Sequence, residues 1–114
     1  MEDNKTTNNK FFKEFTLVNL LESEALTVWN QLQVGTDVSL EQAEDSVKVL
    51  FDKKWIGNLP KNESKIILDI LSCGWNDIFE GRICKKDERE QYDQRIHIAV
   101  YIKKNSNPVQ EKKD

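Results

Sequence analysis

Residues 55–75 read WIGNLPKNESKIILDILSCGW, and the predicted fold is built around them. They predict the end of a strand, a turn, one amphipathic helix and the end of that helix. Gly57 permits a backbone that a Cβ would obstruct, and Pro60 cannot donate to a sheet, so the strand should end by Pro60. Asn62 suits the N-cap of the helix, and Gly74 suits the left-handed position that closes many helices.

The predicted helix carries one apolar stripe, made of Ile66, Ile67, Ile70 and Leu71. One short helix cannot bury such a stripe alone, so it must lie on a sheet. Alternating apolar and polar residues predict the strands of that sheet. They fall within residues 11–20, 37–41, 47–56, 77–84 and 95–102. The third of these segments should fold as a hairpin around residues 52–54, and the last two should pair as a long hairpin with residues 85–91 at its tip.

The sequence does not decide the secondary structure of residues 22–33, which fit either a short helix or a loop that places Trp29 in the core. The rest predicts a β-rich α+β domain, in which a small antiparallel sheet curls, or closes into a barrel, and carries one main helix. The domain should span residues 11–104, with polar, disordered tails at residues 1–10 and 105–114.

The composition of the chain fits one soluble globular domain. The chain has 114 residues, of which 38% are hydrophobic and 32% are charged. No apolar run approaches the ~18 residues that span a bilayer, and the first residues do not form a secretory signal. Cys73 and Cys84 lack metal or redox spacing, so we expect reduced thiols in a cytoplasmic protein without a membrane anchor.

No motif for catalysis is found in the sequence. His97 is the only histidine and falls on the polar face of a predicted strand. Neither cysteine has a neighbour that guarantees a reactive thiolate. No phosphate-binding glycine-rich loop and no set of metal ligands is present. The sequence therefore predicts a protein that is not an enzyme and has no cofactor.

Charge and aromatic residues indicate binding instead. The net charge is −3, but the first half of the chain is acidic and the second half is mildly basic. Trp55, Asn58, Lys61 and Lys65 cluster around one predicted turn. Lysines beside an aromatic ring could hold a phosphate while a base stacks. The alternative is that Trp55 caps the core and the lysines keep the turn soluble.

Two groups of motifs are similar to those of a known family. Residues 32–40, LQVGTDVSL, are similar to its strand entry L-x-x-G-D-x-L-x-L, and VKVLF…WIGNLPK (residues 47–61) is similar to A-V-x-V…x-I-G-Y-L-P-K. Gly74-Trp75, residues 79–83 and residues 96–103 match the stretches after its helix. On these motifs the chain resembles the HIRAN domain, a module of helicase-like repair ATPases of the SNF2 type that also occurs as small stand-alone bacterial proteins.

The resemblance implies a small OB- or SH3-like β-barrel that recognises single-stranded DNA, in characterised members at a free 3′-hydroxyl end. Asn58 and Lys61 stand where the family places a polar residue and a lysine near the nucleotide. The family's Asn-Pro-Tyr-Asp segment is replaced by residues 42–46, QAEDS, and its basic-aromatic run by residues 19–24, NLLESE. Glutamates there would repel a phosphate backbone, so the chain resembles a HIRAN fold with an eroded or rebuilt end-binding pocket.

The sequence thus predicts a non-enzymatic nucleic-acid-binding module, for single-stranded DNA or DNA ends in replication or repair. Its predicted contacts are Lys54, Trp55, Asn58, Lys61 and Lys65. The alternative is a protein-interaction adaptor of the same fold whose DNA pocket is lost. Such an adaptor would recruit its partner through an open sheet edge, such as the Ile96–Ile102 strand. Either protein could be a monomer or an edge-to-edge dimer.

Overall fold

The computed structural model describes residues 9–103 of the chain. Its strands are β1 (Asn9–Thr16), β2 (Asp37–Gln42), β3 (Val47–Phe51), β4 (Lys54–Asn58), β5 (Phe79–Lys86) and β6 (Ile96–Lys103). Its helices are α1 (Lys65–Ser72) and the 3-10 turns η2 (Trp29–Gln31), η3 (Lys61–Glu63) and η4 (Tyr92–Gln94). The expected tails lie outside the described residues, except that Asn9 and Lys10 already belong to β1.

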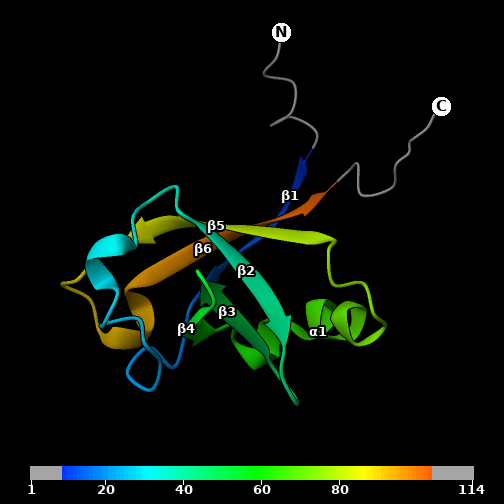
Figure 1. Cartoon of the computed structure of the whole chain (residues 1–114), viewed down its shortest axis with the longest axis horizontal. Helices are drawn as coiled ribbons and strands as arrows, with labels where there is room; N and C mark the ends of the chain where they lie inside the picture. The colour runs from blue at the N-terminus through cyan, green and yellow to red at the C-terminus, as the bar shows by residue number, and fades with distance from the viewer. Residues whose placement is uncertain (1–8, 104–114) are drawn as a thin grey trace, which may run out of the picture.

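The strands form one antiparallel sheet of six strands in the order β1-β6-β5-β2-β3-β4. The sheet curls strongly (Figure 1), so the chain just after β1 reaches the other edge of the sheet. There Val18 and Asn58 exchange two backbone hydrogen bonds of 2.9 Å. This single bridge does not close the sheet into a barrel. The fold is of the α+β class, with an open, curled antiparallel sheet and one main helix.

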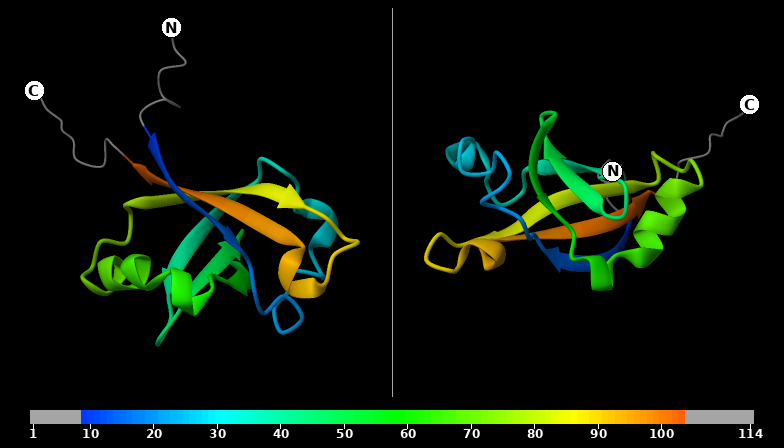
Figure 2. Two further views of the ribbon diagram at one scale, coloured as in Figure 1. Left: turned by 180° about the vertical axis from the view of Figure 1, so that it is seen from behind. Right: turned by 90° about the horizontal axis from the view of Figure 1, so that it is seen from below.

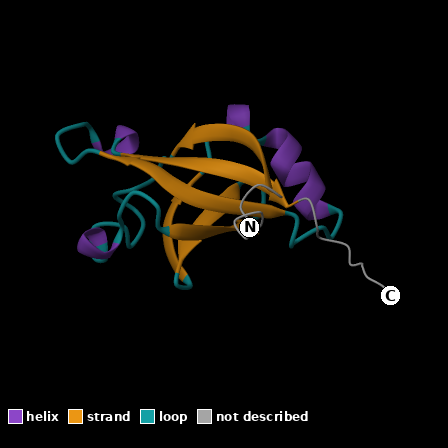
Figure 3. Ribbon diagram, turned by 90° about the horizontal axis from the view of Figure 1, so that it is seen from above, coloured by secondary structure: helices purple, strands orange, loops and turns teal. Residues whose placement is uncertain are grey.

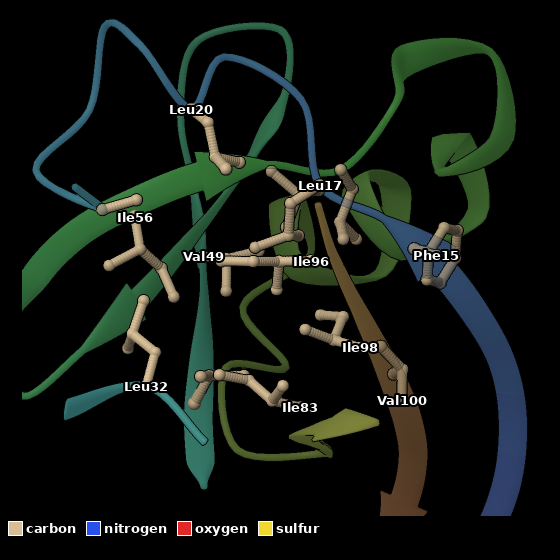
Figure 4. Close-up of a cluster of buried hydrophobic side chains, with 14 of the residues drawn as sticks. Phe15, Leu17, Leu20, Leu32, Val49, Ile56, Ile83, Ile96, Ile98 and Val100 are labelled. Atoms are coloured by element: carbon tan, nitrogen blue, oxygen red, sulfur yellow. The ribbon is translucent and has the colours of Figure 1, made fainter. Parts of the chain in front are cut away.

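The core lies inside the curl of the sheet. Figure 4 shows its side chains converging from β1, β3, β4, β5 and β6. Its fully buried members include Phe15, Leu17, Val49, Ile56, Ile83, Ile96 and Ile98. Alternate residues of a strand point to opposite faces, so the alternation along residues 95–102 correctly predicts that Ile96, Ile98 and Val100 face inward.

Helix α1 starts later than the sequence predicts. The expected N-cap, Asn62, lies in the turn η3, and Ser64 is the N-cap residue instead. The Ser64 hydroxyl donates to the carbonyl oxygen of Pro60 at 2.7 Å, so it holds η3 together and leaves the helix without a side-chain cap. The predicted end is confirmed, because Gly74 follows the C-cap with φ of 93°.

The apolar stripe of α1 is also narrower than predicted. Ile67 and Leu71 are buried and Ile70 is half-buried, whereas Ile66 is 60% exposed. A helix of 3.6 residues per turn turns position 66 away from the sheet once positions 67 and 71 face it. Figures 2 and 3 show α1 at one end of the sheet and η2 with η4 at the other end.

Two further expectations have clear outcomes. Residues 22–33 form turns and η2, as the loop alternative expected. Its placement of Trp29 in the core is wrong, because Trp29 is only half-buried and Ala25, Val28 and Leu32 fill the core there. The Ile96–Ile102 strand is not an open edge, because β6 pairs with β1 on one side and with β5 on the other. The edge strands are β1 and β4.

Candidate nucleic-acid interface

The β3–β4 hairpin brings Trp55 and Asn58 onto one face of the sheet. In a regular strand, residues three apart point to opposite faces. Here β4 contains one extra residue, Ile56, between the cross-strand pairs Leu50–Trp55 and Val49–Gly57. The extra residue shifts the alternation of side chains by one position. As a result, Trp55 and Asn58 both lie on the outer face, while Ile56 enters the core.

A chain of hydrogen bonds fixes the indole of Trp55. Its Nε1 donates to Asn58 Oδ1 at 2.7 Å and to the carbonyl oxygen of Gly57 at 3.0 Å. The Asn58 Nδ2 donates in turn to Ser46 Oγ at 3.1 Å, and Ser46 is buried. Both polar atoms of the Asn58 side chain therefore have partners within the protein, and their effect is to orient the ring.

Three of the lysines around this ring have different surroundings. The ammonium of Lys48, on β3, lies 5.4 Å from the Trp55 ring centroid. Lys61 Nζ lies 3.0 Å from Asp45 Oδ2, in an exposed ion pair. Strand alternation places Lys54 on the face of Ile56 and not on that of Trp55. The described residues offer no ion-pair partner to Lys48 or Lys54.

Lys65 lies apart from this group. It belongs to α1, and its Nζ lies 3.2 Å from Asp69 Oδ2, one helical turn further on. Such exposed pairs contribute at most ~1 kcal/mol, so a phosphate could displace the aspartate. Among the described residues, Lys65 makes no hydrogen bond or ring contact with Trp55 or Asn58. The structure thus brings Trp55, Asn58 and, through Asp45 and Ser46, Lys61 together.

The free edge of β4 is partly covered by the segment that follows β1. The backbone N–H of Glu24 donates to the Trp55 carbonyl oxygen at 2.8 Å, and Val18 pairs with Asn58. The covered edge leaves the outer face of the hairpin as the accessible surface. The covering segment also places one acid, Glu24, next to the backbone of Trp55.

Sequence reasoning did not include Lys48 and Ser46 in the site. The signal for Lys48 was available, because the alternation in Val47-Lys48-Val49 points it outward on the strand next to Trp55. Its position opposite Asn58 depends on the extra residue in β4, which the pattern does not show. Ser46 lies in a polar turn where nothing in the sequence distinguishes it from its neighbours.

The groups considered for catalysis have defined surroundings in the structure. His97 Nδ1 lies 2.9 Å from Glu14 Oε2 on the outer face of β6 and β1. Partial burial, and after it the charge of Glu14, raise the pKa of the Cys84 thiol. A raised pKa opposes nucleophilic chemistry at neutral pH. Within residues 9–103 no group of three or more His, Cys, Asp or Glu side chains could hold a metal ion.

A second accessible feature lies at the α1 end of the molecule. Asp69, Ile70, Cys73, Trp75 and Ile78 line a mostly apolar hollow of about 380 Å³. Trp75 is 61% exposed beside it. A hollow of this volume with a mostly apolar lining resembles sites that take a small ligand or an apolar side chain.

These features define a small β-rich domain with an open, curled sheet and a fixed tryptophan on its outer face. No helix within residues 9–103 is long and apolar enough to cross a membrane. No family model and no curated protein matches the chain. Its fold is similar to the crystal structure of a structural-genomics target from Lactobacillus plantarum, with a TM-score of 0.69 at 13% identity, over 82% of this chain and 94% of that one. At this identity the similarity shows a shared fold and says nothing about activity.

Proposed function

We propose that the chain is a non-enzymatic module that binds single-stranded nucleic acid, with a base stacking on Trp55. The observation that carries the proposal is the fixed indole on the outer face of β3 and β4, with the Lys48 ammonium beside it. Base–aromatic stacking contributes ~1–3 kcal/mol per base. A side chain that is already held in place loses little rotamer freedom on binding.

The hydrogen bonds divide the residues of this site into two roles. Asn58 and Ser46 position the ring, and Lys48 and Lys61 supply positive charge for phosphates. For Lys61 the phosphate must displace Asp45, and such an exposed pair is weak. We remove Lys54 and Lys65 from the predicted contacts, because Lys54 lies on the face of β4 opposite to Trp55 and the ion pair of Lys65 with Asp69 lies on α1.

Fluorescence anisotropy with a labelled single strand of ~10 nucleotides tests this proposal, since single-strand sites cover ~4–16 nucleotides. Lys48→Ala should weaken binding and reduce the slope of log K against log salt by about 0.7, as expected for one lost phosphate contact to a single strand. Lys65→Ala is the matched control, because it removes a lysine that lies away from the ring, and should change neither value. Equal effects of both variants would contradict the assignment of the site to the hairpin.

The same assay tests the end recognition that the HIRAN resemblance implies. Asn58 is already bonded to Trp55 and Ser46, and Lys61 is paired with Asp45. We therefore expect equal affinity for strands that end in a 3′-hydroxyl and in a 3′-phosphate. A clear preference for the free hydroxyl would show instead that these residues rearrange into the family's pocket.

The hollow at the α1 end favours a second candidate function, a protein-interaction adaptor. Its apolar lining and the exposed Trp75 suit an apolar side chain of a partner. For an identified partner, Trp75→Ser should then abolish binding while single-strand binding stays unchanged.

A further inference from the structure

A second group of aromatic and basic side chains lies at the tip of the β5–β6 hairpin, which folds over Trp29. The Arg95 guanidinium lies 4.3 Å from the Tyr92 ring centroid and 5.8 Å from that of Trp29. The Lys86 ammonium lies 4.7 Å from the Trp29 centroid and donates to the Trp29 carbonyl oxygen at 2.8 Å. Trp29 Nε1 donates to Glu88 Oε1 at 3.1 Å. We call Trp29, Lys86, Glu88 and Arg89 the tip site.

The tip site borders an open hollow of about 400 Å³, lined by Trp29, Asn30, Lys86, Asp87, Glu88 and Arg89. This volume is within the range of small-molecule pockets. Unlike the hollow at α1, it mixes one aromatic ring, two cations and two carboxylates. The carboxylates disfavour a free phosphate, but they can accept hydrogen bonds from the amino groups of a base.

Several donors and acceptors at this hollow have no partner among the described residues. An ammonium has three N–H donors, and the Trp29 carbonyl takes one from Lys86. The Arg89 side chain is 88% exposed, and its Nε and Nη2 donate to the Asp87 carboxylate. Its Nη1 is therefore available as a donor to a ligand. Glu88 uses Oε1 on Trp29, so its Oε2 remains as an acceptor.

We propose that the tip site binds a second nucleotide of the same single strand. The base stacks on Trp29, its exocyclic amino group donates to Glu88, and the phosphate contacts Lys86 and Arg89. Because an amino group is required, the tip site prefers cytosine to thymine. This inference rests on the proposed function and adds a base preference to it.

One strand can reach both sites. The backbone of Trp55 accepts a hydrogen bond from Glu24, and Glu24 leads into Trp29 through a turn in which Val28 N–H donates to the Glu24 carbonyl oxygen. The views in Figures 1 and 2 place η2 and the β5–β6 tip at the same end of the molecule.

The test compares labelled oligocytidine and oligothymidine of ~10 nucleotides by anisotropy. The wild type should bind oligocytidine ~5–10-fold more tightly, the effect of one good base contact. Glu88→Ala should bring this ratio close to one without loss of oligothymidine binding. Arg89→Ala should weaken both oligomers equally, and the matched Lys65→Ala control should affect neither.

The outcomes separate the two proposals. A wild-type ratio near one, or a ratio that Glu88→Ala leaves unchanged, overturns the tip site while Lys48-dependent binding still supports the site at Trp55. If neither oligomer binds at low salt, the proposed function and the tip site both fall. The ratio of the two affinities decides the test, because a change in the overall charge of the protein would alter the affinities for oligocytidine and oligothymidine equally.

Discussion

A single residue, Gly57, allows the candidate site to form. Its φ of 148° and its place beside the extra residue of β4 let Asn58 turn back to the indole of Trp55. A Cβ at this position would lie 2.9 Å from the carbonyl oxygen of Val18 and 3.3 Å from Leu17 Cβ. The sequence predicted a backbone that excludes a Cβ here, and the contact with Val18 gives the reason.

Gly57→Ala should therefore lower the free energy of unfolding by ~2 kcal/mol or more, since backbone must move to admit the methyl group. Gly35→Ala is the control, because Gly35 also has a positive φ but has nothing within 4 Å of its Cβ position. Urea unfolding of both variants measures the difference. Equal losses would mean that the approach of Val18 to Gly57 is not tight in solution.

At the same scale, Glu14 should suppress the reactivity of Cys84. Burial and then the Glu14 charge raise the thiol pKa, so less thiolate exists at a given pH. In a Cys73→Ser background, Glu14→Gln should speed alkylation of Cys84 at pH 8, by less than about tenfold because a tenfold change needs a full pKa unit. The pH profile of the alkylation rate should shift to lower pH. An unchanged profile would mean that burial alone raises the pKa of the Cys84 thiol.

At the scale of elements, the sequence predicts most of what is found. Apolar alternation located every strand, and Gly74 located the end of α1. The start of α1 was wrong because two capping residues, Asn62 and Ser64, compete within one turn, and the hydroxyl bond of Ser64 to Pro60 decides between them. The role of β6 was also wrong, because alternation gives the face of a strand and not its neighbours in the sheet.

The turn of the β3–β4 hairpin offers a test at this scale. Asp52 and Lys53 have φ of 51° and 69°, the left-handed pair of a type I′ turn, in which glycine is preferred at the second position. Lys53→Gly should raise the free energy of unfolding by up to about 1 kcal/mol, because a side chain in this region costs ~1–2 kcal/mol. Lys53→Ala removes the same charge and should give no gain. Thermal unfolding distinguishes them, and a loss of stability with glycine would contradict the turn type.

At the scale of the whole molecule, the two ends of the sheet differ in chemistry. One end carries the tip site, where the Trp29 ring lies beside the Lys86 ammonium, and the hydrogen bond from Glu24 joins Trp55 to the segment that leads there. The other end carries α1 and the apolar hollow beside Trp75. The sequence indicated binding at Trp55 from a cluster within one turn, but the tip site joins residues far apart in the chain, so no local pattern could reveal it.

The measurement that tests the central proposal most directly is an NMR titration of the ¹⁵N-labelled protein with an unlabelled single strand of ~10 nucleotides. The proposal predicts that the Trp55 indole N–H and the amide of Lys48 shift as the strand is added, while the Trp75 indole stays in place. A saturating titration that leaves Trp55 unmoved, or that moves Trp75 alone, would contradict it.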